Sequence, residues 1–172
     1  MTKPILIAYF SRADKNYVNG GIANLTIGNT EAVALKLHEM TESHLFKINP
    51  AQKYSVDYQI CTEEAQREFR ANARPELKET LDSIEAYETI LLAYPNWWGT
   101  MPMPVWTFLE QHDFAGKNIL PLCTHEGSGM GKSENDIRKL CPGANVLKGL
   151  AIKGSNVKNI DSALSEWLSK SL

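Results

Sequence analysis

The chain has 172 residues, of which 43% are hydrophobic and 22% charged, and its formal net charge is -2. This length and composition fit one domain with an ordinary buried core, which we expect to span residues 1–172. The weakly negative charge, and the lack of a basic stripe along the sequence, argue against a nucleic-acid-binding protein.

Cysteine content and hydropathy indicate where the protein works. The three cysteines are odd in number and show no C-x-x-C spacing, so we expect neither a disulfide framework nor a metal site. The N-terminus leads directly into an apolar run of strand length instead of a signal peptide. No apolar stretch approaches the length of a membrane span. We therefore expect a cytoplasmic protein without membrane contacts.

Buried strands and amphipathic helices alternate along the chain. The apolar run at 5–10 is typical of a strand buried on both faces, and a polar, glycine-containing segment follows it up to Asn29. Further strands are expected, in chain order, at 44–48, 89–94, 118–123 and 146–152. Helices are expected from Thr30, over about 56–70, after the proline-rich segment that ends at 104, from 133 and from 161.

The order of these elements predicts the fold class. Five strands alternating with helices indicate a doubly wound α/β sheet with helices on both faces. Ser133 and Asp136 have the spacing of an N-cap pair for the fourth helix, which Pro142-Gly143 would stop. Sheets of this kind bind ligands at the carboxyl ends of their strands, so the loops after the first, third and fourth strands form the candidate site.

The first of these loops begins at Ser11 and ends with Gly28-Asn29-Thr30 at a helix start. Hydroxyl groups and free backbone N–H groups at a helix N-terminus are suited to bind a phosphate. Arg12 or Lys15 could add positive charge. Asn29 and Thr30 are also ordinary helix-capping residues, so capping alone would explain them equally well.

The second loop reads Tyr94-Pro95-Asn96-Trp97-Trp98-Gly99 and continues to Pro102 and Pro104, so it contains three prolines in all. Tryptophan is an unusual choice for a surface loop, and indole faces on a stiff loop offer a platform for another flat ring. The alternative is that the indoles fill a gap over the core. We favour a platform in which one indole holds a ring while the other packs beneath the loop.

The third loop reads Thr124-His125-Glu126-Gly127-Ser128-Gly129 and precedes Met130-Gly131-Lys132-Ser133. It resembles a triphosphate-binding loop, but Glu126 stands where G-x-x-x-x-G-K-[ST] requires its first glycine, which argues against a nucleoside triphosphatase. The G-x-S-x-G motif of a serine hydrolase is absent. No acidic residue follows the first strand, as a phospho-receiver domain would need.

Taken in order, Tyr9-Phe10-Ser11, Gly28-Asn29-Thr30 and the second and third loops resemble those of flavodoxin-like FMN-binding proteins. The resemblance covers nearly the whole chain and is greatest to the bacterial flavodoxin and Trp-repressor-binding-like branch. It implies five parallel strands in the order 2-1-3-4-5 and a non-covalent FMN. The implied cofactor-binding residues are Ser11, Arg12, Asn29, Thr30, Pro95, Asn96, Trp97, Trp98, Gly99, Thr124, His125, Gly127, Ser128 and Gly129.

The family's phosphate would lie near Ser11, Asn29 and Thr30, and its flavin ring between the second and third loops. The phosphate loop of the family is short, whereas residues 12–27 intervene here. This difference leaves the roles of Arg12 and Tyr17 open and makes the insertion a candidate lid or partner surface.

Such a flavoprotein would carry out electron transfer or flavin-dependent oxidoreduction. One form is an NAD(P)H:acceptor oxidoreductase of quinone type, and another is an electron carrier for a redox partner protein, which the mild net charge supports only weakly. His125 could donate a proton near the ring, or it could merely shape its loop. A non-catalytic FMN-binding interaction protein is the alternative, and a homodimer stays open.

Overall fold

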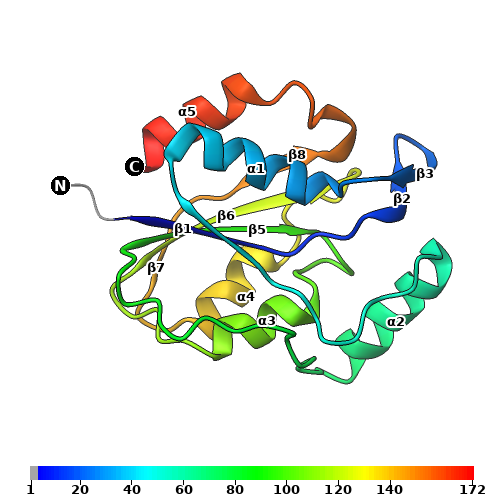
Figure 1. Ribbon diagram of the computed structural model, residues 1–172, viewed down its shortest axis with the longest axis horizontal. Helices are drawn as coiled ribbons and strands as arrows, with labels where there is room; N and C mark the ends of the chain where they lie inside the picture. The colour runs from blue at the N-terminus through cyan, green and yellow to red at the C-terminus, as the bar shows by residue number, and fades with distance from the viewer. Residues whose placement is uncertain (1–3) are drawn as a thin grey trace.

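The computed structural model describes residues 4–172 and shows a three-layer α/β arrangement (Figure 1). The strands are β1 (Ile5–Tyr9), β2 (Asp14–Val18), β3 (Gly21–Leu25), β4 (His44–Lys47), β5 (Thr89–Pro95), β6 (Asn118–His125), β7 (Asn145–Val146) and β8 (Leu150–Lys153). The helices are α1 (Asn29–Thr41), α2 (Tyr58–Arg70), α3 (Met103–Glu110), α4 (Ser133–Leu140) and α5 (Asp161–Ser171), with a 3₁₀ turn at Gly154–Asn156.

The main sheet is parallel throughout, in the order β4-β1-β5-β6-β7, and β8 also pairs with β6. Its central strands β1, β5 and β6 are apolar and almost completely buried, because α1 and α5 cover one face and α3 and α4 the other (Figure 1). With the β2–β3 pair set aside and β7 and β8 counted as one, this order is the predicted 2-1-3-4-5. The predicted fold class is confirmed.

The predicted strand at 146–152 is interrupted. The Leu147 amide still donates to the Ile119 carbonyl of β6 at 2.9 Å. Lys148 and Gly149 then leave the sheet because their backbone groups bond elsewhere: the Trp167 indole donates to the Lys148 carbonyl at 3.0 Å, and the Gly149 amide donates to Glu134 at 3.2 Å. Gly149 also lies so close to Pro121 that a Cβ would approach the Pro121 carbonyl oxygen to 2.9 Å. The last strand is therefore two short pieces, β7 and β8.

The long polar segment after β1 is not an open loop. Its residues form β2 and β3, an antiparallel hairpin that makes a separate two-stranded sheet and lies beside the start of α2 (Figure 1). The turn residues Asn19 and Gly20 have φ of 51° and 84°, as a type I′ turn requires at both central positions. The Asn-Gly pair is the sequence signal from which this hairpin could have been predicted.

Ser133 and Asp136 do not cap α4, whose N-cap residue is Lys132. Both side chains point inward instead. The Ser133 hydroxyl accepts from the Tyr94 hydroxyl at 2.8 Å, and Asp136 accepts from the Thr100 hydroxyl at 2.6 Å. These buried bonds connect α4 to β5 and to the loop after it, which is why the predicted capping pair is wrong.

Helix α2 begins two residues later than expected from the sequence, at Tyr58. Asp57 caps it by accepting from the Ile60 amide at 2.9 Å.

Within residues 4–172, every helix is too short or too polar to cross a lipid bilayer.

The loops after β5 and β6 meet through glycine backbones, which yields a stability prediction. Gly131 has a φ of 55°, and a Cβ there would collide with the Gly99 carbonyl group. Gly116 has a φ of 77° with open space around it and serves as the matched control. We expect Gly116→Ala to cost ~1–2 kcal/mol of unfolding free energy through backbone strain alone. Gly131→Ala should cost at least ~1 kcal/mol more, because the two loops must separate. Urea unfolding of both variants measures the difference, and equal losses would contradict the close contact.

Candidate functional site

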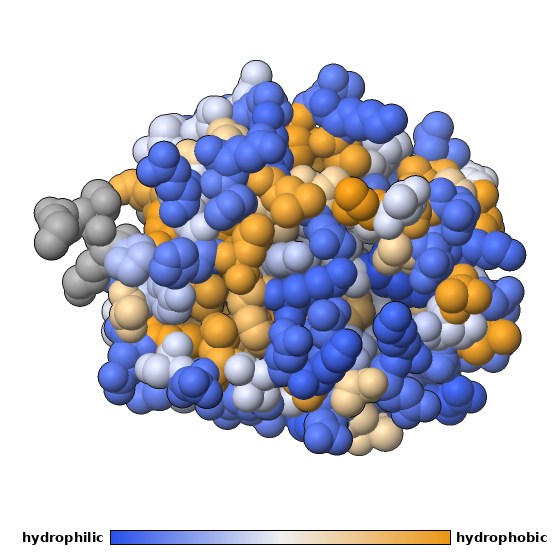
Figure 2. All heavy atoms as spheres, viewed as in Figure 1, coloured by the Kyte–Doolittle hydropathy of each residue, from blue (hydrophilic) through white to orange (hydrophobic). Residues whose placement is uncertain are grey.

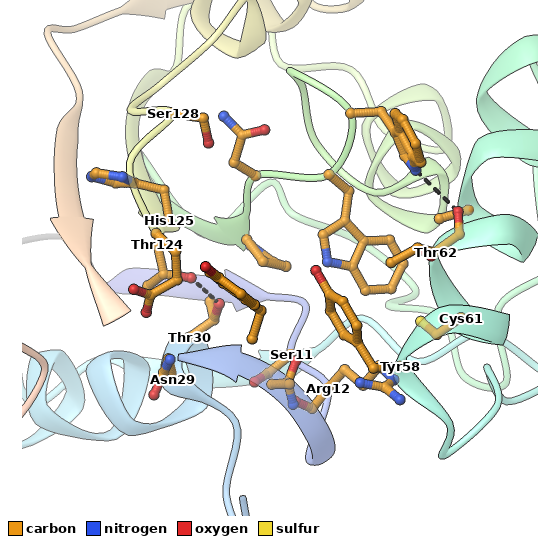
Figure 3. A pocket seen from close by; sticks show the side chains of 18 of the residues that line it. Ser11, Arg12, Asn29, Thr30, Tyr58, Cys61, Thr62, Thr124, His125 and Ser128 are labelled. Carbon is orange, nitrogen blue, oxygen red and sulfur yellow. Dashed lines mark hydrogen bonds between the residues drawn. The ribbon is translucent and has the colours of Figure 1, made fainter. Parts of the chain in front are cut away.

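A cavity of about 730 Å³ opens at the carboxyl ends of β1, β5 and β6 (Figure 3). Segments far apart in the sequence line it. They are the end of β1 with the hairpin (Ser11, Arg12, Asn16, Tyr17), the start of α1 (Asn29, Thr30), α2 (Tyr58, Gln59, Cys61, Thr62, Ala65), the loop after β5 (Pro95, Asn96, Trp97, Trp98) and the loop after β6 (Thr124, His125, Glu126, Gly127, Ser128).

The N-terminus of α1 forms one end of this cavity. Its N-cap residue is Gly28, which supplies no capping side chain, and Asn29 and Thr30 are the first helical residues rather than caps. A Cβ at Gly28 would approach the Arg12 carbonyl oxygen to 2.5 Å, so glycine lets the strand end come close to the helix. The Ser11 hydroxyl accepts from the Glu31 amide at 3.0 Å, whereas the Asn29 and Thr30 amides find no acceptor among residues 4–172. Two backbone donors are thus left at a positive helix end.

A buried hydroxyl pair joins this helix end to the sheet. Thr30 is 2% exposed, and its Oγ1 lies 2.7 Å from Oγ1 of Thr124 at the end of β6 (Figure 3). One of these two hydroxyls donates its hydrogen to the other. The hydroxyl that accepts keeps its own hydrogen, which can point toward the cavity or toward a backbone acceptor. This hydrogen bond connects the start of α1 to the end of β6, and so fixes the distance between the first and third predicted loops.

The two adjacent tryptophans point to different places. Trp97 packs edge-on against Phe10 and Tyr54, with both ring centroids 5.0 Å away, and belongs to the rim of the core. Trp98 is 46% exposed, and its indole N–H donates to the Thr62 carbonyl of α2 at 3.1 Å (Figure 3). Its φ of 57° is unusual for a bulky residue and shows that the loop imposes this exposed position. Both indoles line the cavity. Trp97 packs against the core, whereas Trp98 is exposed.

Asn96 holds the second and third loops together. Its Oδ1 accepts from the Gly99 amide at 3.0 Å, and its Nδ2 donates to the Gly129 carbonyl at 2.8 Å. Gly99 and Gly129 lie outside the lining of the cavity and serve these loop contacts in the structure. The other twelve candidate residues predicted from the sequence do line the cavity.

Arg12 lines the cavity, but its guanidinium is used elsewhere. It donates to the carbonyls of Ser55 at 2.7 Å and Val56 at 2.9 Å and to that of Lys15. The side chain thereby fixes the segment before α2 to the base of the hairpin. Lys15 does not line the cavity, so neither predicted cation presents a free charge at the start of α1.

Sequence reasoning named residues 12–27 as a candidate lid or partner surface but did not predict that they form a hairpin, and it missed the contribution of α2. Tyr17 stacks on Tyr58 with ring centroids 6.4 Å apart and an interplanar angle of 29°, and Tyr58 points from α2 toward the middle of the cavity (Figure 3). The signal for α2 is the spacing of its lining residues, which recur at helical intervals. They are Tyr58, Cys61, Thr62 and Ala65.

The site offers neither a reactive thiolate nor, among the described residues, a cluster of metal ligands. Burial raises the pKa of the Cys61 thiol to about 11 and that of Cys123 to about 12, so neither is a thiolate near neutral pH. The cysteines in the described part of the chain are free and buried. Among residues 4–172, no three His, Cys, Asp or Glu side chains gather as a metal site would need.

Residues 5–171 match the family model described as flavodoxin, and the chain belongs to this family. Among solved structures, a candidate flavoprotein from Bacteroides eggerthii is 28% identical, with a TM-score of 0.80 over 99% of this chain and 98% of that one. Another, from Bacteroides uniformis, is 27% identical, with a TM-score of 0.74 over 96% and 99%. A flavoprotein from Lactobacillus acidophilus in complex with FMN is 20% identical, with a TM-score of 0.65 over 97% and 99%. Comparison with curated proteins gave no match.

The His125 imidazole supports a prediction about pH. Its Nδ1 accepts from the Gly127 amide at 2.8 Å, and desolvation, together with Lys153, lowers its pKa below 6.5 against the opposing effect of Glu126. We therefore expect the ring to be neutral at neutral pH, with its proton on Nε2. Because the unfolded chain takes up this proton first, stability from the neutral ring is present above pH 6.5 and is lost as the pH falls through the folded-state pKa.

An NMR titration of the ring should place its pKa below 6.5, and urea unfolding of His125→Asn should show a weaker loss of stability in acid than the native chain. His112, whose pKa is also lowered by burial, is present in both proteins and cancels in the comparison. A titration midpoint above 6.5 would contradict the acceptor role of Nδ1.

Proposed function

We propose that this protein binds FMN non-covalently in the cavity and uses it for oxidoreduction. The single observation that carries this proposal is the pairing of an open helix N-terminus with an aromatic wall across one cavity. The Asn29 and Thr30 amides without acceptors lie at one end, and Trp97, Trp98 and Tyr58 line another part. A phosphate and a flat ring joined in one ligand would satisfy both.

The residues present fit such a ligand. A phosphate at the start of α1 would accept from the free amides and gain from the helix dipole, with Ser11 and Asn29 beside it. The ring would lie against the indoles, where stacking is worth about 0.5–1.5 kcal/mol beyond area burial. The volume of about 730 Å³ lies in the range of sites that enclose small ligands. The FMN bound to the Lactobacillus acidophilus flavoprotein supports the proposal.

When bound, the flavin supplies the redox chemistry, and the protein controls access and potential. The loop after β6 would face the ring with backbone groups and with the neutral His125, whose Nδ1 is engaged by Gly127. This geometry favours loop shaping as the role of His125 over proton donation. Trp97, which is half-buried and packed against Phe10 and Tyr54, would exclude water from its side of the ring.

The surface at the mouth of the cavity favours a small acceptor over a steered protein partner. Large apolar side chains are exposed on the hairpin, on α2 and just before it, and in the loop after β5. They are Tyr17, Ile22, Val56, Ile60 and Trp98. Figure 2 shows apolar groups among hydrophilic ones at the surface over the hairpin and α2. The net charge of -2 provides little electrostatic attraction for a basic protein. We therefore propose reduction by NAD(P)H, with a planar quinone-type molecule as acceptor. Rapid reduction of the flavin by a reductase protein but not by NAD(P)H would instead identify an electron carrier.

Titration with flavins tests the proposal and the position of the phosphate. We expect the native chain to bind both FMN and riboflavin, with quenching of flavin fluorescence. Asn29→Asp places a negative charge in the first turn of α1, where it suits the helix but repels a phosphate. It should weaken FMN binding about tenfold or more and weaken riboflavin binding much less, because riboflavin carries no phosphate to be repelled. A native chain that neither binds FMN nor is stabilised by it would rule out the proposed function.

Alanine variants of the two tryptophans separate packing from ring binding. Trp97→Ala removes two edge-on aromatic contacts and should lower the unfolding free energy by about 2–4 kcal/mol. Trp98→Ala changes an exposed side chain and should change stability by less than ~1 kcal/mol. Both should weaken FMN binding, Trp98→Ala by about two- to tenfold, the equivalent of one stacking contact. If FMN affinity is unchanged in both, the indoles only pack against the protein.

A further inference from the structure

Glu126 follows β6 directly, and its two carboxylate oxygens have different surroundings. Oε2 accepts from the Asn19 amide at the tip of the hairpin, at 3.3 Å. Oε1 is buried and has no hydrogen-bond partner among residues 4–172. The side chain also lines the cavity. One oxygen is thus engaged by the hairpin, while the other is left unsatisfied at the site.

An unsatisfied buried carboxylate oxygen indicates what should complete it. A carboxylate only accepts hydrogen bonds, so a fitting group must carry an O–H or N–H. Leaving such an acceptor buried and unpaired is unfavourable. A phosphate dianion carries no hydrogen to donate and would be repelled. The group that fits is therefore a neutral donor such as a hydroxyl.

The surroundings of Oε1 place it next to the start of α1. A Cβ on Gly154 would collide with both Oε1 and the side-chain nitrogen Nδ2 of Asn29, so a side chain at Gly154 would displace them. Although it lies nearby, Nδ2 of Asn29 makes no hydrogen bond to Oε1. In a flavin mononucleotide, a polyol chain connects the phosphate to the ring. A phosphate at the amides of α1 would bring the hydroxyls of that chain beside Asn29 and Glu126.

The hairpin that Glu126 contacts is held by few interactions. Most of its residues are exposed, and a two-stranded hairpin has little stability alone. Arg12 and Asn16 fix its base through backbone carbonyls, and Tyr17 stacks on Tyr58. The tip contacts the body of the protein through the bond from Asn19 to Glu126. The orientation of the Glu126 side chain therefore affects the position of the tip.

We propose that Glu126 accepts a hydrogen bond from a hydroxyl of the ligand's polyol chain and, in doing so, holds the β2–β3 hairpin closed over the ligand. This inference rests on the proposed function. The hydroxyl would satisfy Oε1 and restrict the carboxylate, so that Oε2 stays in place for Asn19. The coupling is reciprocal: a ligand with a polyol chain stabilises the closed hairpin, and the closed hairpin slows release of that ligand.

Three flavins of decreasing size test this role by titration: FMN, riboflavin and lumiflavin, whose ring carries no polyol chain. Glu126→Ala should weaken FMN and riboflavin binding about tenfold or more, as expected for loss of a charged hydrogen bond, and leave lumiflavin binding unchanged. Glu126→Gln keeps a neutral acceptor and should show a smaller loss. Glu85→Ala is the control, since Glu85 is exposed and precedes the amino end of β5, away from the cavity.

Hydrogen exchange of the hairpin amides provides a second readout. Riboflavin should slow exchange at the tip of the hairpin in the native chain and in Glu85→Ala, but not in Glu126→Ala. Lumiflavin should have little effect on the tip in any of the three proteins. These outcomes would support both parts of the inference.

Other outcomes would overturn it. Equal weakening of lumiflavin and riboflavin by Glu126→Ala would show that the residue acts on the ring site or the fold and not on the polyol chain. If Glu126→Ala binds all three flavins as tightly as the native chain does, this inference fails while the proposed function stands. If the native chain binds no flavin, both fail.

Discussion

The arrangement of the site depends on the parallel pairing of β1, β5 and β6. In this register Tyr9 lies opposite Ala93, and Pro95 lies opposite Thr124, so the three strands end at the same edge. Where each strand ends, backbone N–H and C=O groups need new hydrogen-bond partners. They find some of these partners in the neighbouring loops, which contact one another. The Thr30–Thr124 hydroxyl pair and the two bonds of Asn96 are consequences of this shared edge. A helix N-terminus and an aromatic loop are thereby brought to the same cavity.

Periodicity and turn residues were sufficient to locate the central strands of the main sheet, whereas the strand order was implied by the family resemblance. The apolar runs of β1, β5 and β6 are long and bounded by polar segments, and their alternation with helices leaves few topologies. The loops at the carboxyl ends followed from that topology, which is why Ser11, Asn29, Trp97 and Thr124 were predicted to meet. The rule that ligands bind at the carboxyl ends of the strands in such sheets therefore located one side of the cavity.

The other side could not be found in the same way. The hairpin was signalled by Asn19-Gly20, but its position over the cavity depends on Tyr17 and Glu126, residues that are far apart in the chain. The placement of α2 depends on Arg12, whose guanidinium binds the carbonyls before that helix. The same limit explains Ser133: its capping pattern is local, whereas its buried bond to Tyr94 is tertiary. Patterns in a single sequence describe local preference, and these contacts override it.

The divided last strand affects how the sheet meets its surroundings. An edge strand that is long and regular exposes a row of unpaired backbone groups onto which another chain can add. Here the edge beyond β6 consists of two pieces, Asn145–Val146 and Leu150–Lys153. Between them, the Lys148 carbonyl bonds to Trp167 and the Gly149 amide to Glu134. The opposite edge strand, His44–Lys47, is only four residues long and ends in a lysine. Neither edge of the main sheet offers a template of useful length, so this sheet is protected against the strand-to-strand association that begins aggregation.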